Sequence, residues 1–312
     1  MCFDLDSRPP IPPMAGGAVA SERLTLTAAD GNRLLACAAW AGEAPSPAAM
    51  LILPDVRGLH RYYEELALRF AEAGIDAIAI DYFGRTTSSG DRGAGFEFMA
   101  HVPRTTWAGL RADTAAGAAH LRAAGERALF TIGFCFGGRL ALLTPTIPEL
   151  RVAGAVGFYG WPVGPTRTDM PAPAERAAAN TAPVLAIFGG ADAGIPAATV
   201  ATYEAALAAA GAPHEIVSYP DAPHSFFDRK QADFADASAD AWRRVLDFVR
   251  ADAHSHVPRE PPTSMGGEHL IACPGPPRTS RPPRRRFVAT WFATSGVWTP
   301  WAVVRWRIKG GS

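Results

Sequence analysis

Short, almost uninterrupted apolar runs alternate along this chain with longer stretches in which apolar residues recur every three or four positions. The short runs predict eight strands: LTLT near 24, LLACAAW near 34, MLIL at 50, AIAI at 77, LFTIGF at 129, VAGAVGFY at 152, PVLAIFG at 183 and EIVSY at 215. Runs such as AIAI show no polar alternation, so both faces of the sheet must be covered. The pattern predicts a doubly wound α/β arrangement, with a mostly parallel sheet between two layers of helices.

The longer stretches predict five helices: YEELALRFAEAG from 63, WAGLRADTAAGAAHLRAAG from 107, GGRLALLTP from 137, ATVATYEAALAAAG from 198 and FADASADAWRRVLDFVRA from 234. Two of them carry an apolar stripe, formed by Tyr63, Leu66 and Phe70 in the first helix and by Trp242, Val245 and Phe248 in the last. Spacings of three and four residues place each stripe on one face of its helix. We expect both stripes to pack against the sheet.

The periodic pattern ends near residue 253, and the segment from 254 to 312 holds nine prolines and a Trp-rich end. Such a composition buries too little apolar surface to offset the entropy of ordering it. We therefore expect an N-terminal extension over residues 1–20, one α/β domain over 21–252 and a Pro/Arg/Trp-rich tail without a fixed fold over 253–312. A tail that contacts a membrane or RNA is the alternative interpretation.

The charge of the chain is balanced but unevenly placed. Its 312 residues include 30 basic and 30 acidic ones, but nine of the basic and only two of the acidic residues follow residue 253. With no net charge to attract nucleic acid or a membrane surface, we expect neither partner. The four cysteines form no CxxC pair, and the N-terminus has neither the basic residues nor the apolar run of a signal peptide. These features predict free thiols in a cytoplasmic protein, either monomer or dimer.

The stretch IGFCFGGRLA, residues 132–141, places Cys135 between Gly133 and Gly137 where a strand meets a helix. This is the layout of the nucleophile elbow G-x-S-x-G, with sulfur in place of oxygen. The glycines leave room for a sharp, strained turn, and the helix N-terminus favours a thiolate. A buried cysteine that only packs is the alternative. A phosphate-binding loop is excluded because its G-x-x-x-x-G-K-[ST] spacing is missing.

A catalytic thiol needs a base, and the base needs an orienting carboxylate. In hydrolases with this elbow, the chain order is nucleophile, acid, histidine. Two strand ends downstream supply these groups in that order, with Asp192 in PVLAIFGGADAGIP and His224 in EIVSYPDAPHSFFD. Both follow parallel strands at the edge where open α/β sheets build their sites. His101, His120 and His214 lack this context.

Taken together, five segments resemble the dienelactone hydrolase family, a branch of the α/β-hydrolase fold with a cysteine nucleophile. They are LPDVRGL at 53–59, IDYFGRT at 80–86, GFCFGGRLAL at 133–142, FGGADAGIP at 188–196 and YPDAPHSFFD at 219–228. They extend over roughly residues 20 to 250. The resemblance implies the α/β-hydrolase fold and hydrolysis of lactones or activated esters through an acyl-thioester, with no cofactor or metal.

The resemblance also implies roles for individual residues. The triad would be Cys135, Asp192 and His224. An acidic residue that interacts with the resting thiol matches Asp55, where family members often have Glu. The remaining matches are the N–H groups of Phe136 and Val56, which would form the oxyanion hole, and Arg85 and Arg229, which would bind a substrate carboxylate. Arg229 lies one residue farther from the histidine than in the family pattern.

Two other classes of function stay open at this point. A non-catalytic binding protein of the α/β-hydrolase fold would keep the scaffold without using Cys135. A thiol redox protein would need a second cysteine near Cys135 in the sequence, and the nearest is Cys37. The complete set of triad residues favours a hydrolase that acts on small-molecule lactones or esters.

The composition of the tail leads to a first prediction. Because residues 254–312 are not expected to pack against the domain, deleting them should leave the melting temperature and the hydrolytic activity nearly unchanged. Differential scanning calorimetry and an ester hydrolysis assay on the full and shortened chains test this. A large loss of either property would show that the tail packs against the domain.

Overall fold

The computed structural model describes residues 3–14, 20–88 and 90–256, the last three without their side chains. The chain divides into two units, residues 1–259 and 260–312. Beyond residue 256 the predicted tail lies outside the described residues.

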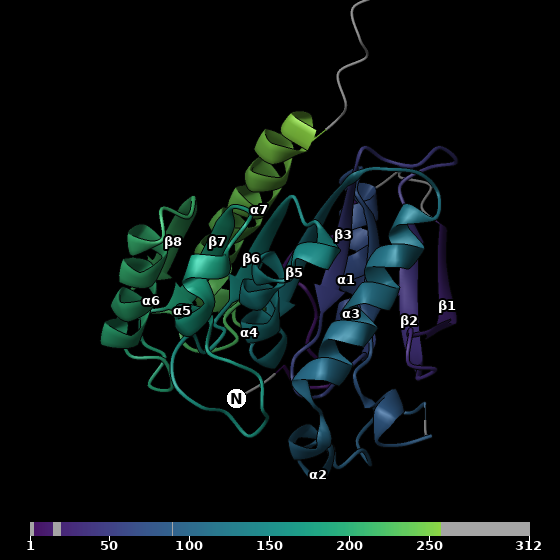
Figure 1. The fold of residues 1–312 in the computed structure, drawn as a ribbon, viewed down its shortest axis with the longest axis horizontal. Coiled ribbons are helices and arrows are strands. Elements are labelled where there is room, and N and C mark those ends of the chain that lie inside the picture. The colour runs from purple at the N-terminus through teal and green to yellow at the C-terminus, as the bar shows by residue number, and fades with distance from the viewer. Residues whose placement is uncertain (1–2, 15–19, 89, 257–312) are drawn as a thin grey trace, which may run out of the picture. The chain divides into compact units, whose positions relative to one another are not determined.

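The described part of the chain is built on one eight-stranded sheet in the order β1-β2-β4-β3-β5-β6-β7-β8 (Figure 1). The strands are β1 (Ala20–Thr27), β2 (Arg33–Trp40), β3 (Ala48–Leu53), β4 (Asp76–Ile80), β5 (Ala128–Phe134), β6 (Gly154–Phe158), β7 (Val184–Gly189) and β8 (His214–Tyr219). The β1–β2 and β2–β4 pairs are antiparallel, and the other pairs are parallel. The predicted strand count and the mostly parallel arrangement are confirmed.

Helices cover both faces of this sheet. They are α1 (Arg61–Glu72), α2 (Phe98–His101), α3 (Trp107–Arg122), α4 (Phe136–Leu143), α5 (Pro173–Arg176), α6 (Ala197–Ala209) and α7 (Ala235–His256). The helices α1 and α7 pack into one apolar cluster and α3 and α4 into another, and Figure 1 shows α3 and α4 in front of the sheet with α7 behind it. The expected double winding is confirmed.

Strand β3 shows why the apolar runs are uninterrupted. Met50 and Ile52 belong to the cluster with α1 and α7, whereas Leu51 and Leu53 belong to the cluster with α3 and α4. All six residues of β3 are buried. Because side chains alternate between the two faces of a strand, each face needs its own apolar set. The predicted stripe of α1 is likewise fully buried.

The structure differs from the sequence pattern at two kinds of position. Helix α1 begins at Arg61 rather than at Tyr63, with His60 as its N-cap. The one-turn helices α2 and α5 were not predicted, because four residues are too few to show a helical period. Neither difference alters the arrangement of the sheet.

Residues 3–14, part of the predicted extension, pack on the α/β core. The Phe3 ring is 2% exposed and stacks on Tyr62 with ring centroids 3.9 Å apart. Farther along, the Arg8 N–H donates to Asp228 Oδ1 at 3.1 Å, and the Arg229 N–H donates to the Arg8 carbonyl at 2.9 Å. The start of the chain thus braces the loop that follows β8.

We expect Phe3→Ala to lower the free energy of unfolding by about 3–5 kcal/mol, because truncating a buried ring leaves a cavity. Urea denaturation followed by circular dichroism measures the change. Met14→Ala is the control, since its side chain is 49% exposed and its truncation should cost less than about 0.5 kcal/mol. Equal stability of the Phe3 variant and the wild type would mean that the segment does not dock in solution.

Candidate active site

Cys135 occupies a strained turn between β5 and α4. Its φ is 55° and its ψ is −111°, a conformation that residues with a side chain rarely adopt. A Cβ at Gly133 would collide with the Gly137 carbonyl, and one at Gly137 would collide with the Leu53 carbonyl. Both glycines are therefore required for the turn to form. The turn presents the partly exposed thiol at the N-terminus of α4, facing a pocket.

Asp192 and His224 come from the loops after β7 and β8, and they meet at this pocket. His224 Nδ1 lies 2.6 Å from Asp192 Oδ2, and Asp192 Oδ1 accepts from the Gly194 N–H at 2.8 Å. The two loops pass close to each other because Gly189 lies against the Ala222 carbonyl without a side chain. Burial alone would raise the pKa of Asp192, but the hydrogen bonds from His224 and Gly194 outweigh it and lower that pKa. Asp192 is thus held as a carboxylate.

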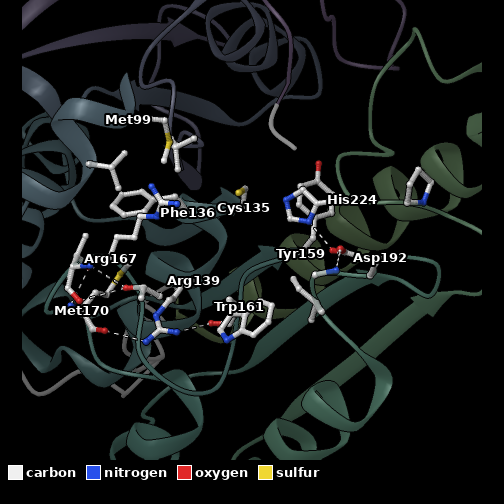
Figure 2. Close-up of a pocket in the computed structure, with 18 of the residues that line it drawn as sticks. Met99, Cys135, Phe136, Arg139, Tyr159, Trp161, Arg167, Met170, Asp192 and His224 are labelled. Carbon is white, nitrogen blue, oxygen red and sulfur yellow. Dashed lines mark hydrogen bonds and ion pairs between the residues drawn. The ribbon is translucent and has the colours of Figure 1, made fainter. Parts of the chain in front are cut away.

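The other imidazole nitrogen of His224, Nε2, does not contact Asp192. With Asp192 ionised, Nδ1 carries the proton and Nε2 is an acceptor. Nε2 is buried and has no hydrogen-bond partner among the described residues, and the same holds for the Tyr159 hydroxyl. Figure 2 shows the imidazole between Asp192 and Cys135, with the edge opposite the Asp192 bond turned toward the sulfur. The three predicted triad residues therefore share one pocket.

The two predicted oxyanion-hole residues also line this pocket. Phe136 is the first residue of α4, so its N–H lacks the hydrogen bond of later helical positions. Val56 follows β3, in the loop that starts at Pro54. Neither N–H donates to a backbone carbonyl among the described residues. Two unpaired donors beside the thiol suit an oxygen that gains negative charge.

Asp55 is buried behind the pocket and is not part of its lining. Its Oδ2 accepts from the Phe3 N–H at 3.0 Å and its Oδ1 from the Arg57 N–H at 2.8 Å. His60 Nε2 lies 3.9 Å from Oδ1. Burial raises the pKa of Asp55 to about 6, and it lowers that of His60 to about 4. The His60 ring is thus neutral at pH 7, while Asp55 titrates just below neutrality.

The structure does not bring Arg85 and Arg229 into the pocket. The Arg85 guanidinium lies 2.6 Å from Asp30 Oδ2 and 2.8 Å from Asp113 Oδ1. Arg229 donates to the Pro9 carbonyl at 3.1 Å. Both side chains already have partners and neither lines the pocket, so the expectation that they bind substrate is not supported.

The pocket has a volume of about 610 Å³ and is mostly apolar. Besides the residues above, its lining includes Met99, Val102, Arg139, Trp161, Thr166, Arg167, Thr168, Met170, Ala191, Ala193, Ile195 and Pro223. Six of these come from Arg139 in α4 and the loop between β6 and α5. Apart from Trp161, which the stretch GFYGWP suggested as a pocket residue, they were not predicted from the sequence, because the loop has no motif or period.

Two absences apply to the described part of the chain. Within residues 3–14, 20–88 and 90–256, no group of three or more His, Cys, Asp or Glu could hold a metal ion. In the same part of the chain, no helix combines the length and apolar character needed to cross a bilayer.

Comparison with known proteins places the chain among its relatives. The family model of the dienelactone hydrolase family matches residues 35–252. A Methylorubrum extorquens protein named "Putative carboxymethylenebutenolidase" is 32% identical over 210 residues, which cover 64% of this chain and 71% of that protein. A Salmonella typhimurium protein of the same name is 33% identical over 213 residues, covering 64% and 75%.

Solved structures show the same likeness. A structure described as a "Putative Dienelactone Hydrolase" from Klebsiella pneumoniae has a TM-score of 0.66 and 30% identity, and the match covers 75% of this chain and 99% of that one. A "Dienelactone Hydrolase-like Promiscuous" phosphotriesterase from metagenomic libraries shares the fold, with a TM-score of 0.56 and 23% identity over 76% of this chain and 99% of that one. The chain therefore belongs to the dienelactone hydrolase family and is a hydrolase of the α/β-hydrolase fold.

The raised pKa of Asp55 predicts how the free energy of unfolding changes with pH. Because burial raises its pKa from 3.8 to about 6, the folded state binds this proton more tightly than the unfolded state does. The resulting stabilisation is complete below the pKa that Asp55 has in the unfolded state. It is lost as the pH rises through the pKa of Asp55 in the folded state. Relative to Asp55→Asn, the wild type should therefore lose roughly 2–3 kcal/mol of unfolding free energy between pH 4 and 7. Urea denaturation across this range tests it, and a constant difference would contradict the raised pKa.

Proposed function

We propose that this protein hydrolyses lactones or activated esters through Cys135, with His224 as general base and Asp192 as the group that orients it. The observation that carries this proposal is the strained turn that presents Cys135 to the same pocket as the His224–Asp192 pair. Strained backbone conformations cluster at functional sites, and covalent catalysis requires a base with a free acceptor nitrogen next to the nucleophile. A protein that only binds ligands needs neither of them.

The first half of the reaction acylates the enzyme. His224 Nε2 accepts the thiol proton while Sγ of Cys135 forms a bond to the substrate carbonyl carbon. The π electrons move onto the carbonyl oxygen, which the N–H groups of Phe136 and Val56 stabilise. The bond to the leaving oxygen then breaks, and the imidazolium returns its proton to that oxygen. The product is an acyl-thioester on Cys135.

The second half releases the acid. His224 takes a proton from water, and the water oxygen attacks the thioester carbonyl through the same oxyanion hole. The carbon–sulfur bond breaks, and the thiolate recovers its proton from His224. In this scheme Asp55 acts on the thiol electrostatically, because its buried negative charge disfavours thiolate formation in the resting enzyme.

The chemistry of sulfur and the pocket lining narrow the substrate class. A thiolate leaves more readily than an amine, so adducts of plain amides collapse back to substrate, whereas enol lactones and aryl esters proceed. Relatives named carboxymethylenebutenolidase and lactonase point in the same direction. Arg167 is exposed at the pocket and has no ion-pair partner among the described residues, so we assign it, rather than Arg85, as the cation available to a substrate carboxylate.

The test compares Cys135→Ala with Cys37→Ala, its matched control. Cys37 is buried in β2 and its pKa is raised to about 11 by burial, so its thiol should be inert. We expect Cys135→Ala to lower kcat/KM for 4-nitrophenyl acetate and for a dienelactone by at least about 10³-fold, with unchanged circular dichroism. Cys37→Ala should retain wild-type turnover. Undiminished hydrolysis by the Cys135 variant would refute the assignment.

The thioester can be detected directly. Acid quenching within the first turnover, followed by mass spectrometry of the peptide that contains Cys135, should show the mass of an added acetyl group. If the acetyl group appears on another residue, Cys135 is not the nucleophile.

A further inference from the structure

Arg139 is a buried cation that holds backbone rather than a carboxylate. It lies in the first turn of α4, is 2% exposed, and forms no ion pair with a described residue. Its guanidinium donates to the carbonyls of Pro171 at 3.1 Å, Trp161 at 3.0 Å, Gly164 at 2.9 Å and Met170 at 3.0 Å. All four acceptors belong to the loop between β6 and α5.

This loop has little structure of its own. Among the described residues, none of residues 160–172 donates a backbone hydrogen bond to another backbone carbonyl. Three of its residues are prolines, which have no N–H to donate. Its other hydrogen bonds to the rest of the chain run from the Trp107 N–H to Asp169 Oδ1 and from the N–H groups of Ala174 and Glu175 in α5 to the carbonyls of Pro162 and Ala172. Within the loop, Thr168 bonds to Thr166 and Met170. The four bonds from the guanidinium are the largest set that any one residue supplies to the loop.

The loop and the nucleophile are connected through Arg139. The Arg139 N–H donates to the Cys135 carbonyl at 3.0 Å, and a Cβ at Gly160 would collide with the Arg139 backbone nitrogen. Figure 2 shows the Arg139 guanidinium beneath the pocket, bonded to the loop that carries Trp161, Arg167 and Met170. Because one residue joins both elements, the distance from the thiol to the loop is fixed.

The position of the loop in the pocket indicates which part of the substrate it would contact. His224 must reach the leaving oxygen to protonate it, so the leaving group lies on the His224 side of Cys135. The acyl part then extends away from His224. Figure 2 shows Arg167, Met170 and the Phe136 ring on that opposite side.

We propose that Arg139 is a positioning residue that holds the loop over residues 161–171 as the wall of the acyl-binding side, and thereby sets the acyl-chain preference of the enzyme. This inference rests on the proposed ester and lactone hydrolysis. It predicts that loss of the guanidinium changes selectivity among acyl groups more than it changes the chemistry at Cys135.

The test measures 4-nitrophenyl acetate, butanoate and hexanoate with wild type, Arg139→Met and Arg139→Lys. The hexanoate-to-acetate ratio of kcat/KM should fall at least about fivefold in Arg139→Met, through a higher KM for hexanoate, while kcat for acetate stays within about twofold. Arg139→Lys should keep part of the wild-type hexanoate-to-acetate ratio, because lysine retains the positive charge and some hydrogen-bond donors. Arg243→Met, which removes an exposed guanidinium from α7, is the control and should leave the ratio unchanged.

A second readout does not depend on activity. Trypsin cleaves after arginine, and Arg167 is exposed within the loop. Cleavage after Arg167 should become at least about fivefold faster in Arg139→Met and should not change in Arg243→Met. If Arg139→Met does not fold, Arg139→Lys is the test variant for both measurements.

The outcomes separate the two proposals. A wild type that hydrolyses none of these esters refutes the proposed function, and faster cleavage after Arg167 would still support the role of Arg139 in the loop. An active wild type whose variants keep the same acyl ratio and the same cleavage rate overturns the inference. A uniform loss of activity toward all three esters also overturns it, because that is the behaviour of a merely structural residue.

Discussion

The close approach of backbone segments around residue 135 is the constraint on which the site depends. A side chain at Gly137 would strike the carbonyl of Leu53 at the end of β3, and one at Gly138 would strike the carbonyl of Phe158 at the end of β6. The absence of both lets α4 start directly against two neighbouring strand ends. The Cys135 N–H can then donate to the Phe158 carbonyl at 3.0 Å, which holds the strained residue in place. The surrounding packing thus maintains a conformation that the residue alone would not adopt.

The remaining parts of the site follow from the parallel order of the strands. Strands β3, β5, β6, β7 and β8 all end at the same edge of the sheet, so the loops after them bring Val56, Cys135, Tyr159, Asp192 and His224 together. Contacts within and between these loops hold the groups, as the Gly194 N–H holds Asp192 and Asp192 holds His224. Because the sheet fixes the starting points of the loops, the proposed catalytic groups need little reorganisation when a substrate binds.

The sequence predicted the features that depend on local pattern. The strands were visible as apolar runs, Cys135 and Asp192 as residues just beyond strand ends with glycines around them, and His224 as a histidine in the loop after the next strand. Arg85 was placed at the pocket by its motif, but its partners Asp30 and Asp113 lie 55 and 28 residues away in the sequence, and no local pattern indicates that pairing. The roles of Arg139 and Phe3 were missed for the same reason. Their partners are a patternless loop and an aromatic cluster that only tertiary packing assembles.

The docked start of the chain has a consequence for synthesis in the cell. The Arg8 N–H is bonded to Asp228, 220 residues later in the sequence. At typical elongation rates, roughly 10 to 45 seconds separate the emergence of these two residues from the ribosome. During that interval the hydrogen bond from Arg8 to Asp228 cannot form. The loop that carries His224 is thus among the last parts of the domain to be completed on the ribosome.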